Sequence, residues 1–224
     1  MSVTKFGIIG GGIVGKATSR VFMEHGEVQV YDKVSELSTA PLNVVTSSDF
    51  IFVCLPTNWD KDPNSGEFQC DLSPIWDFFT RTSFRDSQTI VLRSTTPVGT
   101  ITEIAESRHI DVVHWPEFLT ARCANVDAQI PARNILGGNL DYNGIHAMNK
   151  LLQKRFPGVP TVICSPEESE LIKLTNNAYF SQKLAFFNEI HLLCSYRGLD
   201  FDTVLSGLRL DDRDWETNTE DVSR

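Results

Sequence analysis

The stretch that decides the fold is residues 5–32, which read KFGIIGGGIVGKATSRVFMEHGEVQVYD. It opens with a short apolar run, residues 6–9, that is typical of a buried strand. Gly10, Gly12 and Gly15 follow in the spacing G-x-G-x-x-G. Gly10 permits a tight bend, Gly12 lets a pyrophosphate approach the backbone, and Gly15 lets a helix lie close on the strand. The stretch therefore predicts the first strand, turn and helix of a doubly wound parallel sheet.

The same stretch predicts a cofactor. A helix that begins near Ile13 would offer the free N–H groups of Ile13 and Val14, and its positive dipole end, to phosphates. The next apolar run ends at Asp32, 22 residues after Gly10. A carboxylate there accepts hydrogen bonds from both ribose hydroxyls of NAD and repels the 2′-phosphate of NADP, although Lys33 beside it weakens this preference. The sequence thus predicts NAD, with a glycine turn that binds no nucleotide as the alternative.

The composition limits the class of protein. The 224 residues are 41% hydrophobic, enough for one domain of ordinary size and a smaller one. Lys and Arg number 20 against 29 Asp and Glu, a net charge of −9, which argues against binding to nucleic acid or to an anionic membrane. No apolar run approaches the roughly 18 residues of a membrane span. The five scattered cysteines indicate reduced thiols in a cytoplasmic protein, without disulfides or a metal site.

A second apolar run predicts the edge of the sheet where a ligand would bind. Residues 50–55, FIFVCL, are typical of a central parallel strand that is covered on both faces. Ligands of open parallel sheets lie beyond the carboxyl ends of the strands. We therefore expect Leu55, Pro56 and Thr57 to border the cofactor, and we expect Cys54 to be a packing residue.

Two later segments add candidate site residues. Residues 89–92 predict a strand, and the RSTTPVGT that follows places Thr95 at the same edge of the sheet, as a cofactor-binding and catalytic candidate. The alternative is that Thr100 caps the next helix and the other hydroxyls satisfy a tight turn. A strand at residues 111–115 leads to PEFL, where Glu117 could act as a base or bond backbone amides.

The last part of the chain predicts a long helix. Ser165 and Glu168 form a capping box at its start, and residues 166–197 are apolar around so much of the helix that a homodimer contact is expected. Lys173 and Asn177 project from one face, four residues apart. This pair could stabilise an alkoxide during hydride removal, or it could be a solvated lysine beside a polar surface.

These elements predict an α/β fold with three parts. Residues 1–164 form a doubly wound parallel Rossmann-type sheet that binds NAD, and they include a weak strand at residues 43–46. Residues 165–209 form a small all-helical dimerisation segment, and residues 210–224 form a polar tail.

The motifs together resemble the UDP-glucose / GDP-mannose 6-dehydrogenase family of nucleotide-sugar dehydrogenases, from Lys5 to about Arg213. The segments that carry the resemblance are GIIGGGIVG, FVCLPTN, RSTTPVGT, PEFL and, most specifically, SPEESELIKLTNNAYFSQKLAFFNEI. The resemblance implies that the C6 alcohol of a UDP- or GDP-sugar is oxidised to the uronate with two NAD. The path passes through an aldehyde and a cysteine-bound thioester that water hydrolyses.

The resemblance also implies residue roles. Thr95 matches the threonine that helps to hold the catalytic water, and Glu117 matches the glutamate of the PEFL segment. Lys173 matches the lysine that stabilises the oxyanion, with Asn177 as its hydrogen-bonding neighbour. The long helix matches the one that joins two Rossmann-like domains and forms the dimer.

The sequence departs from the family pattern in three places. Ala121 stands where the family usually has a second glutamate, which is associated with water activation. The glycine-rich segment with the nucleophilic cysteine, and the C-terminal domain that grips the nucleotide, would lie beyond residue 224. None of the five cysteines stands in that motif, and the final DWETNTEDVSR does not read like the family. We therefore expect a truncated chain that needs a separately encoded C-terminal half or is catalytically impaired.

Three functions stay open. The first is half of a nucleotide-sugar 6-dehydrogenase, and the second is a non-catalytic NAD-binding dimer. The third is a short 3-hydroxyacid-type dehydrogenase that uses Lys173 and Asn177 for a single hydride transfer. The third is disfavoured because PEFL and STTPVGT resemble the sugar dehydrogenases, and because little chain is left to enclose a substrate.

Overall fold

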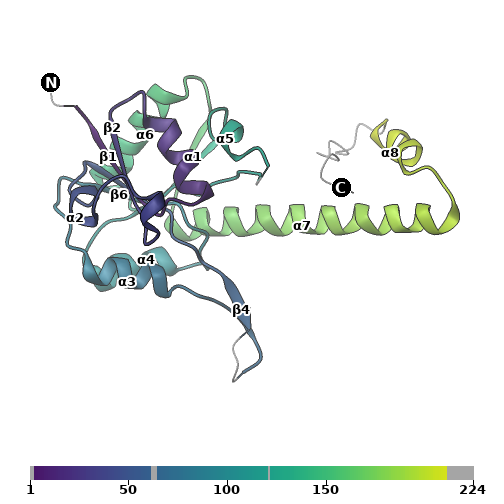
Figure 1. Cartoon of the computed structure of the whole chain (residues 1–224), viewed down its shortest axis with the longest axis horizontal. Helices are drawn as coiled ribbons and strands as arrows, with labels where there is room; N and C mark the ends of the chain where they lie inside the picture. Colours follow the sequence, from purple (N-terminus) through teal and green to yellow (C-terminus); the bar gives the residue numbers. More distant parts are fainter. Residues whose placement is uncertain (1–2, 62–64, 121, 211–224) are drawn as a thin grey trace. The chain divides into compact units, whose positions relative to one another are not determined.

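The computed structural model describes residues 3–61, 65–120 and 122–210 (Figure 1). The chain divides into two compact units, residues 1–174 and residues 175–224. Ala121 and residues 211–224 of the predicted polar tail lie outside the described residues.

The first unit is built on a seven-stranded sheet in the order β2-β1-β3-β6-β7-β8-β9. Its strands are β1 (Lys5–Ile9), β2 (Glu27–Tyr31), β3 (Phe50–Val53), β6 (Thr89–Leu92), β7 (Val113–His114), β8 (Asn134–Gly137) and β9 (Thr161–Cys164). All neighbours pair in parallel except β7 and β8, which meet antiparallel at His114 and Gly137. The predicted parallel α/β sheet is confirmed.

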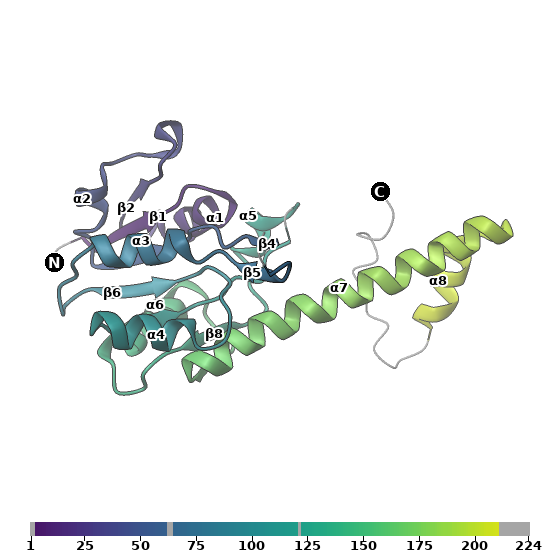
Figure 2. The ribbon, with the colours of Figure 1, turned by 90° about the horizontal axis from the view of Figure 1, so that it is seen from below.

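Helices cover both faces of this sheet, as a doubly wound fold requires. They are α1 (Ile13–Phe22), α2 (Leu42–Val45), α3 (Ser73–Arg81), α4 (Thr100–Arg108), α5 (Ala124–Asp127), α6 (Asn143–Arg155) and the first part of α7 (Pro166–Arg197). In Figure 1, α1, α5 and α6 lie above the sheet and α3 and α4 below it; Figure 2 shows the same layers from below. Strand β3 serves both cores: Phe52 packs with α1, whereas Ile51 and Val53 pack with α3.

The strand predicted at residues 43–46 is wrong, because the structure has the short helix α2 there. The amide of Thr46 donates to the carbonyl of Leu42 (2.8 Å), so the backbone closes on itself instead of pairing with a strand. The helix lies against β1 at Gly7, where a Cβ would be 2.2 Å from the carbonyl oxygen of Val45. This tertiary contact overrides the local preference of Val44 and Val45 for a strand.

A small separate sheet follows β3. Strands β4 (Trp59–Lys61) and β5 (Phe68–Cys70) pair antiparallel, with Trp59 opposite Cys70. Trp59 and Phe68 are 51% and 69% exposed, so this hairpin contributes little to the cores of the first unit.

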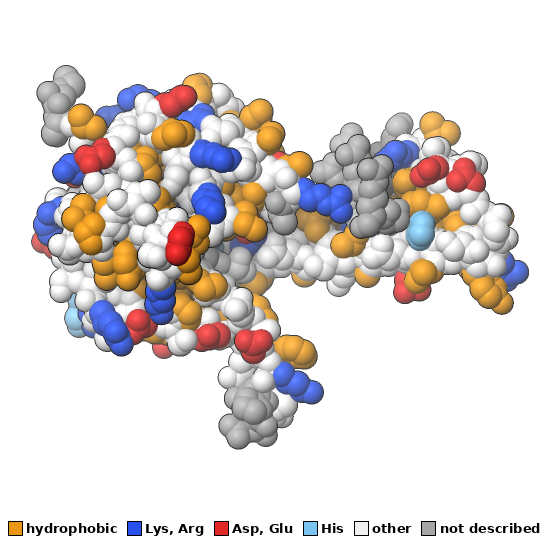
Figure 3. All heavy atoms as spheres, viewed as in Figure 1, with side chains coloured by type: hydrophobic (Ala, Val, Ile, Leu, Met, Phe, Trp, Pro, Cys, Tyr) orange, Lys and Arg blue, Asp and Glu red, His pale blue; other side chains and the backbone are white. Residues whose placement is uncertain are grey.

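The described part of the second unit consists of the later part of α7 and of α8 (Phe201–Arg209). Phe187 and Leu205 form its small core. Gly198, at φ 65°, ends α7 in the left-handed conformation that glycine favours, where the sequence predicts the end of the helix. Phe186 and Leu192 on this part of α7 are 48% and 61% exposed. Figure 3 shows hydrophobic side chains at the surface of this helix.

Candidate functional site

The glycine turn has the geometry that the spacing predicts. Gly10 adopts φ 99°, and a Cβ there would lie 2.4 Å from the carbonyl oxygen of Cys54. A Cβ on Gly15 would lie 1.8 Å from the carbonyl oxygen of Gly10. A Cβ on Gly12, by contrast, would meet nothing within 4 Å. Gly10 and Gly15 therefore make the fold possible, whereas Gly12 leaves the backbone open at the start of α1.

The N-terminus of α1 is free to bind an anion. Its N-cap is Gly12, which has no side chain to accept from the helix, and the first turn contains no acidic residue. The first backbone bond of the helix runs from the amide of Lys16 to the carbonyl of Gly12 (2.9 Å), so the amides of Ile13 and Val14 have no partner in the helix. These groups fit the pyrophosphate of a dinucleotide, because they combine N–H donors with the positive end of the helix dipole.

Asp32 lies at the end of β2 beside the glycine turn. Its Oδ2 accepts from the amide of Gly11 (2.6 Å), and its Oδ1 accepts from the amide of Val34 (2.8 Å). These bonds fix the carboxylate beside the glycine turn and leave lone pairs that could accept from the hydroxyls of a ribose. Lys33 is exposed next to it.

A cavity of about 180 Å³ lies at the carboxyl ends of β3, β6 and β7. Its lining residues are Val14, Cys54, Leu55, Pro56, Thr57, Arg93, Ser94, Thr95 and Glu117. The cavity thus brings together residues that the sequence singled out on four separate segments. Val14, in the first turn of α1, is one of the lining residues, so the cavity adjoins the N-terminus of this helix.

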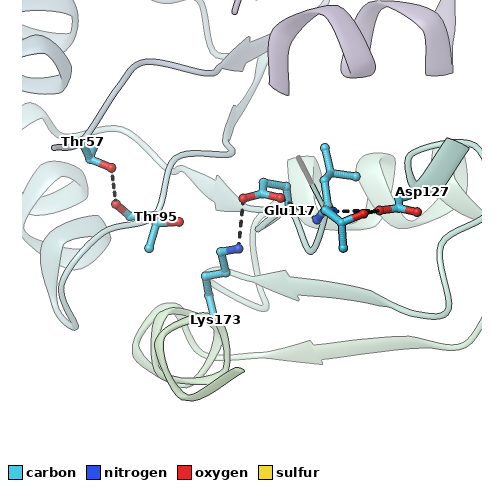
Figure 4. A network of polar contacts seen from close by, with 7 residues as sticks. Thr57, Thr95, Glu117, Asp127 and Lys173 are labelled. Carbon is cyan, nitrogen blue, oxygen red and sulfur yellow. Dashed lines mark hydrogen bonds and ion pairs between the residues drawn. The ribbon is translucent and has the colours of Figure 1, made fainter. Parts of the chain in front are cut away.

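Two hydrogen bonds join the loops that line this cavity. The hydroxyl of Thr57 donates to the carbonyl of Thr95 (2.7 Å; Figure 4), and the hydroxyl of Ser94 donates to the carbonyl of Leu55 (2.6 Å). The loop after β3 and the loop after β6 are therefore held together by side chains from each.

A buried ion pair lies at one side of the cavity. The Nζ of Lys173, on α7, is 3.0 Å from the Oε1 of Glu117 (Figure 4). The Oε2 of Glu117 accepts from the amide of Leu119 (2.7 Å), and the Lys173 ammonium lies 5.3 Å from the centre of the Phe118 ring. Lys173 is 4% exposed, so the alternative of a solvated lysine is wrong. Glu117 does bond a backbone amide, and it faces a cation as well.

Asn177 lies in the second unit, one turn further along α7, and its side chain is exposed. Its catalytic role stays a prediction.

The structure adds two residues to the site. Arg93 is 5% exposed, its guanidinium carbon lies 3.6 Å from the centre of the Trp115 ring, and its buried Nε and Nη1 have no hydrogen-bond partner among the described residues. Burial lowers the pKa of Arg93 to about 10. Burial also raises the pKa of Cys54 to about 11, so this cysteine is a thiol at neutral pH. The sequence signal that could have identified Arg93 is a charged residue directly after the apolar strand β6.

Comparison with known proteins decides the family. The NAD binding domain model of the UDP-glucose/GDP-mannose dehydrogenase family matches residues 27–155, and the model of the family's central domain matches residues 167–219. The chain belongs to the UDP-glucose/GDP-mannose dehydrogenase family. It contains the family's NAD-binding domain, and NAD is the cofactor of that domain.

Individual relatives support the same family. The chain is 26% identical to the UDP-glucose 6-dehydrogenase of Streptococcus pneumoniae over 93% of its own length and 61% of that enzyme. It is 30% identical to the UDP-glucose 6-dehydrogenase YwqF of Bacillus subtilis, over 75% of its own length and 39% of that enzyme. The chain therefore spans less than two thirds of these curated relatives.

Solved structures show the same fold. A ternary complex of GDP-mannose dehydrogenase from Pseudomonas aeruginosa matches 95% of this chain and 58% of its own, at 22% identity and a TM-score of 0.75. A UDP-glucose dehydrogenase from Pyrobaculum islandicum matches at 21% identity, with the same coverage and TM-score. Within the described part of this family member, no helix is both long and apolar enough to cross a bilayer.

Proposed function

We propose that this chain binds NAD in the cavity beside α1 and takes part in the oxidation of the C6 alcohol of a UDP- or GDP-sugar to the uronate. The observation that carries the proposal is the pair of Lys173 and Glu117. It places a buried cation and a carboxylate 3.0 Å apart, and Glu117 lines the cavity that adjoins the dinucleotide-binding turn. Bound NAD would supply the hydride acceptor.

The chain's own residues can meet the other needs of this oxidation. When a sugar alcohol loses a hydride, its hydroxyl must also lose a proton, and the oxygen carries negative charge in the transition state. The Nζ of Lys173 is a donor that can hold that oxygen in a site with little water. The Oε1 of Glu117, which lines the same cavity, can accept the proton. The Thr95 hydroxyl at the cavity wall can orient a water.

We propose that a cysteine from a separately encoded half, and not Cys54, carries the thioester step. Cys54 lines the cavity, but with a pKa raised to about 11 it is a poor nucleophile. A separately encoded C-terminal half, together with a homodimer contact through the 166–197 helix, would complete the enzyme. The second candidate is a non-catalytic NAD-binding dimer, which would bind the cofactor in the same cavity without oxidising a sugar.

The test combines binding with turnover. Calorimetry measures NAD binding, and absorbance measures NADH production with UDP-glucose, GDP-mannose and UDP-N-acetyl sugars. We expect NAD binding by the chain, and production of aldehyde or uronate when a C-terminal half from a relative is added. Lys173→Ala should abolish NADH production, whereas Lys150→Ala, at an exposed position on α6, should not.

Two results would contradict the proposal. If the chain binds no NAD, the cofactor site is wrong. If it binds NAD but no sugar is oxidised with the added half, the non-catalytic dimer replaces the dehydrogenase.

A further inference from the structure

The start of α7 is fixed on the sheet of the first unit. The Oγ of Ser169 lies 2.7 Å from the Nδ1 of His114 on β7. On the neighbouring strand β8, a Cβ on Gly137 would lie 2.0 Å from the same Oγ. The helix therefore packs directly on the backbone of β8. A shift of one residue along the helix axis would break both contacts, so the register of the first turns of α7 is set.

This register places a buried carboxylate against another helix. Glu170 is 0% exposed, and its two oxygens accept three hydrogen bonds. Oε1 accepts from the hydroxyl of Thr96 (3.0 Å) and the amide of Ile101 (3.1 Å), and Oε2 accepts from the amide of Gly99 (2.6 Å). Gly99 is the N-cap of α4 and has no side chain for the task, so a residue from α7 caps α4 instead.

The clamped segment continues into the cavity wall. Ser94 and Thr95, which directly precede Thr96, line the cavity and are joined to Leu55 and Thr57 by the two hydrogen bonds described above. A chain of contacts thus runs from the Glu170 carboxylate to both loops of the cavity. Lys173 lies less than one turn further along α7, so the same anchoring also fixes the ion pair with Glu117.

We propose that Glu170 is a positioning residue that holds the loop of Ser94 and Thr95 in the shape that NAD binding requires. It is not among the residues that line the cavity, and it acts through Thr96 and the first amides of α4. This role rests on the proposed NAD function of the cavity. Glutamine cannot replace the carboxylate, because its NH₂ group would face one of the three donors and leave it without an acceptor.

The test compares Glu170→Gln with Glu168→Gln. Glu168 is exposed two residues earlier on the same helix, and glutamine preserves its capping box, so this control removes the same charge without touching the loop. We expect the dissociation constant for NAD, measured by calorimetry, to rise about tenfold for Glu170→Gln. Glu168→Gln should stay within twofold of wild type. Hydrogen exchange at Gly99 and Ile101 should quicken only in Glu170→Gln.

A second variant covers a failure to fold. Thr96→Val keeps the carboxylate and both amide bonds but removes the hydroxyl donor, and we expect NAD to bind about threefold more weakly. The proposal is overturned if the folded variants bind NAD within twofold of wild type, even if their melting temperatures fall. If wild type itself binds no NAD, the proposed function fails, and faster exchange at Gly99 in Glu170→Gln still reports the clamp.

Discussion

Replacing Gly12 with alanine should separate binding from folding. A Cβ at this position meets nothing within 4 Å, and the backbone is at φ −71°, which any residue adopts. The free energy of unfolding should therefore change by no more than about 0.5 kcal/mol. The new methyl group occupies the space through which a pyrophosphate reaches the amides of Ile13 and Val14. Losing two charge-assisted hydrogen bonds costs about 3 kcal/mol, or roughly a hundredfold in affinity.

The assay is NAD calorimetry together with urea unfolding, on three variants. Gly207→Ala adds a Cβ in open space on α8 and should leave the NAD affinity unchanged. Gly15→Ala forces a Cβ to within 1.8 Å of the carbonyl oxygen of Gly10, so it should destabilise the fold itself. If Gly12→Ala binds NAD within threefold of wild type, the dinucleotide does not approach this turn, and the reasoning is refuted.

Three further predictions concern charged groups. Burial lowers the pKa of His114 from 6.5 to about 3, so between these values the unfolded chain binds more protons, and stability should fall by about 2 kcal/mol from pH 7 to pH 5. Chemical denaturation at both pH values should show this loss in wild type and in His146→Gln, an exposed control, but not in His114→Asn. Lys173→Met and Glu117→Gln should each lower the free energy of unfolding in urea by about 2 kcal/mol, because each leaves the other charge buried without its partner. The double variant should lose less than the sum of the two. Full additivity would mean that the two side chains do not interact. Asp32→Asn should weaken NAD binding about tenfold in calorimetry and should lower the ratio of the NAD affinity to the NADP affinity. If this ratio does not change, Asp32 does not select the cofactor.

Features that depend on a few consecutive residues could be predicted from the sequence. The capping box is one, since Ser165 and Glu168 exchange both backbone bonds that their spacing implies. The turn at Gly10 is another, because only glycine tolerates its positive φ without strain. In both cases the interacting groups are close in sequence, so local chemistry determines the geometry.

Contacts across the fold were beyond reach of the sequence. The valines of α2 favour a strand locally, but Gly7 on β1 admits the backbone of a helix there. Arg93 precedes a turn motif, and nothing near it in sequence indicates that Trp115, which directly follows β7, covers its guanidinium. Such contacts depend on which strands become neighbours, and this is decided by packing of the whole sheet.

Glu170 shows how far local logic can mislead. In the sequence it is one more acid near the start of a helix, where it favours the dipole of its own helix. In the structure its carboxylate bonds Thr96, 74 residues away, and the amides at the start of α4. A carboxylate can stabilise the N-terminus of either helix. The packing of α7 against Gly137 determines that Glu170 bonds α4 rather than its own helix. The same docking brings Lys173 to Glu117, so the cofactor loop and the ion pair depend on one helix register.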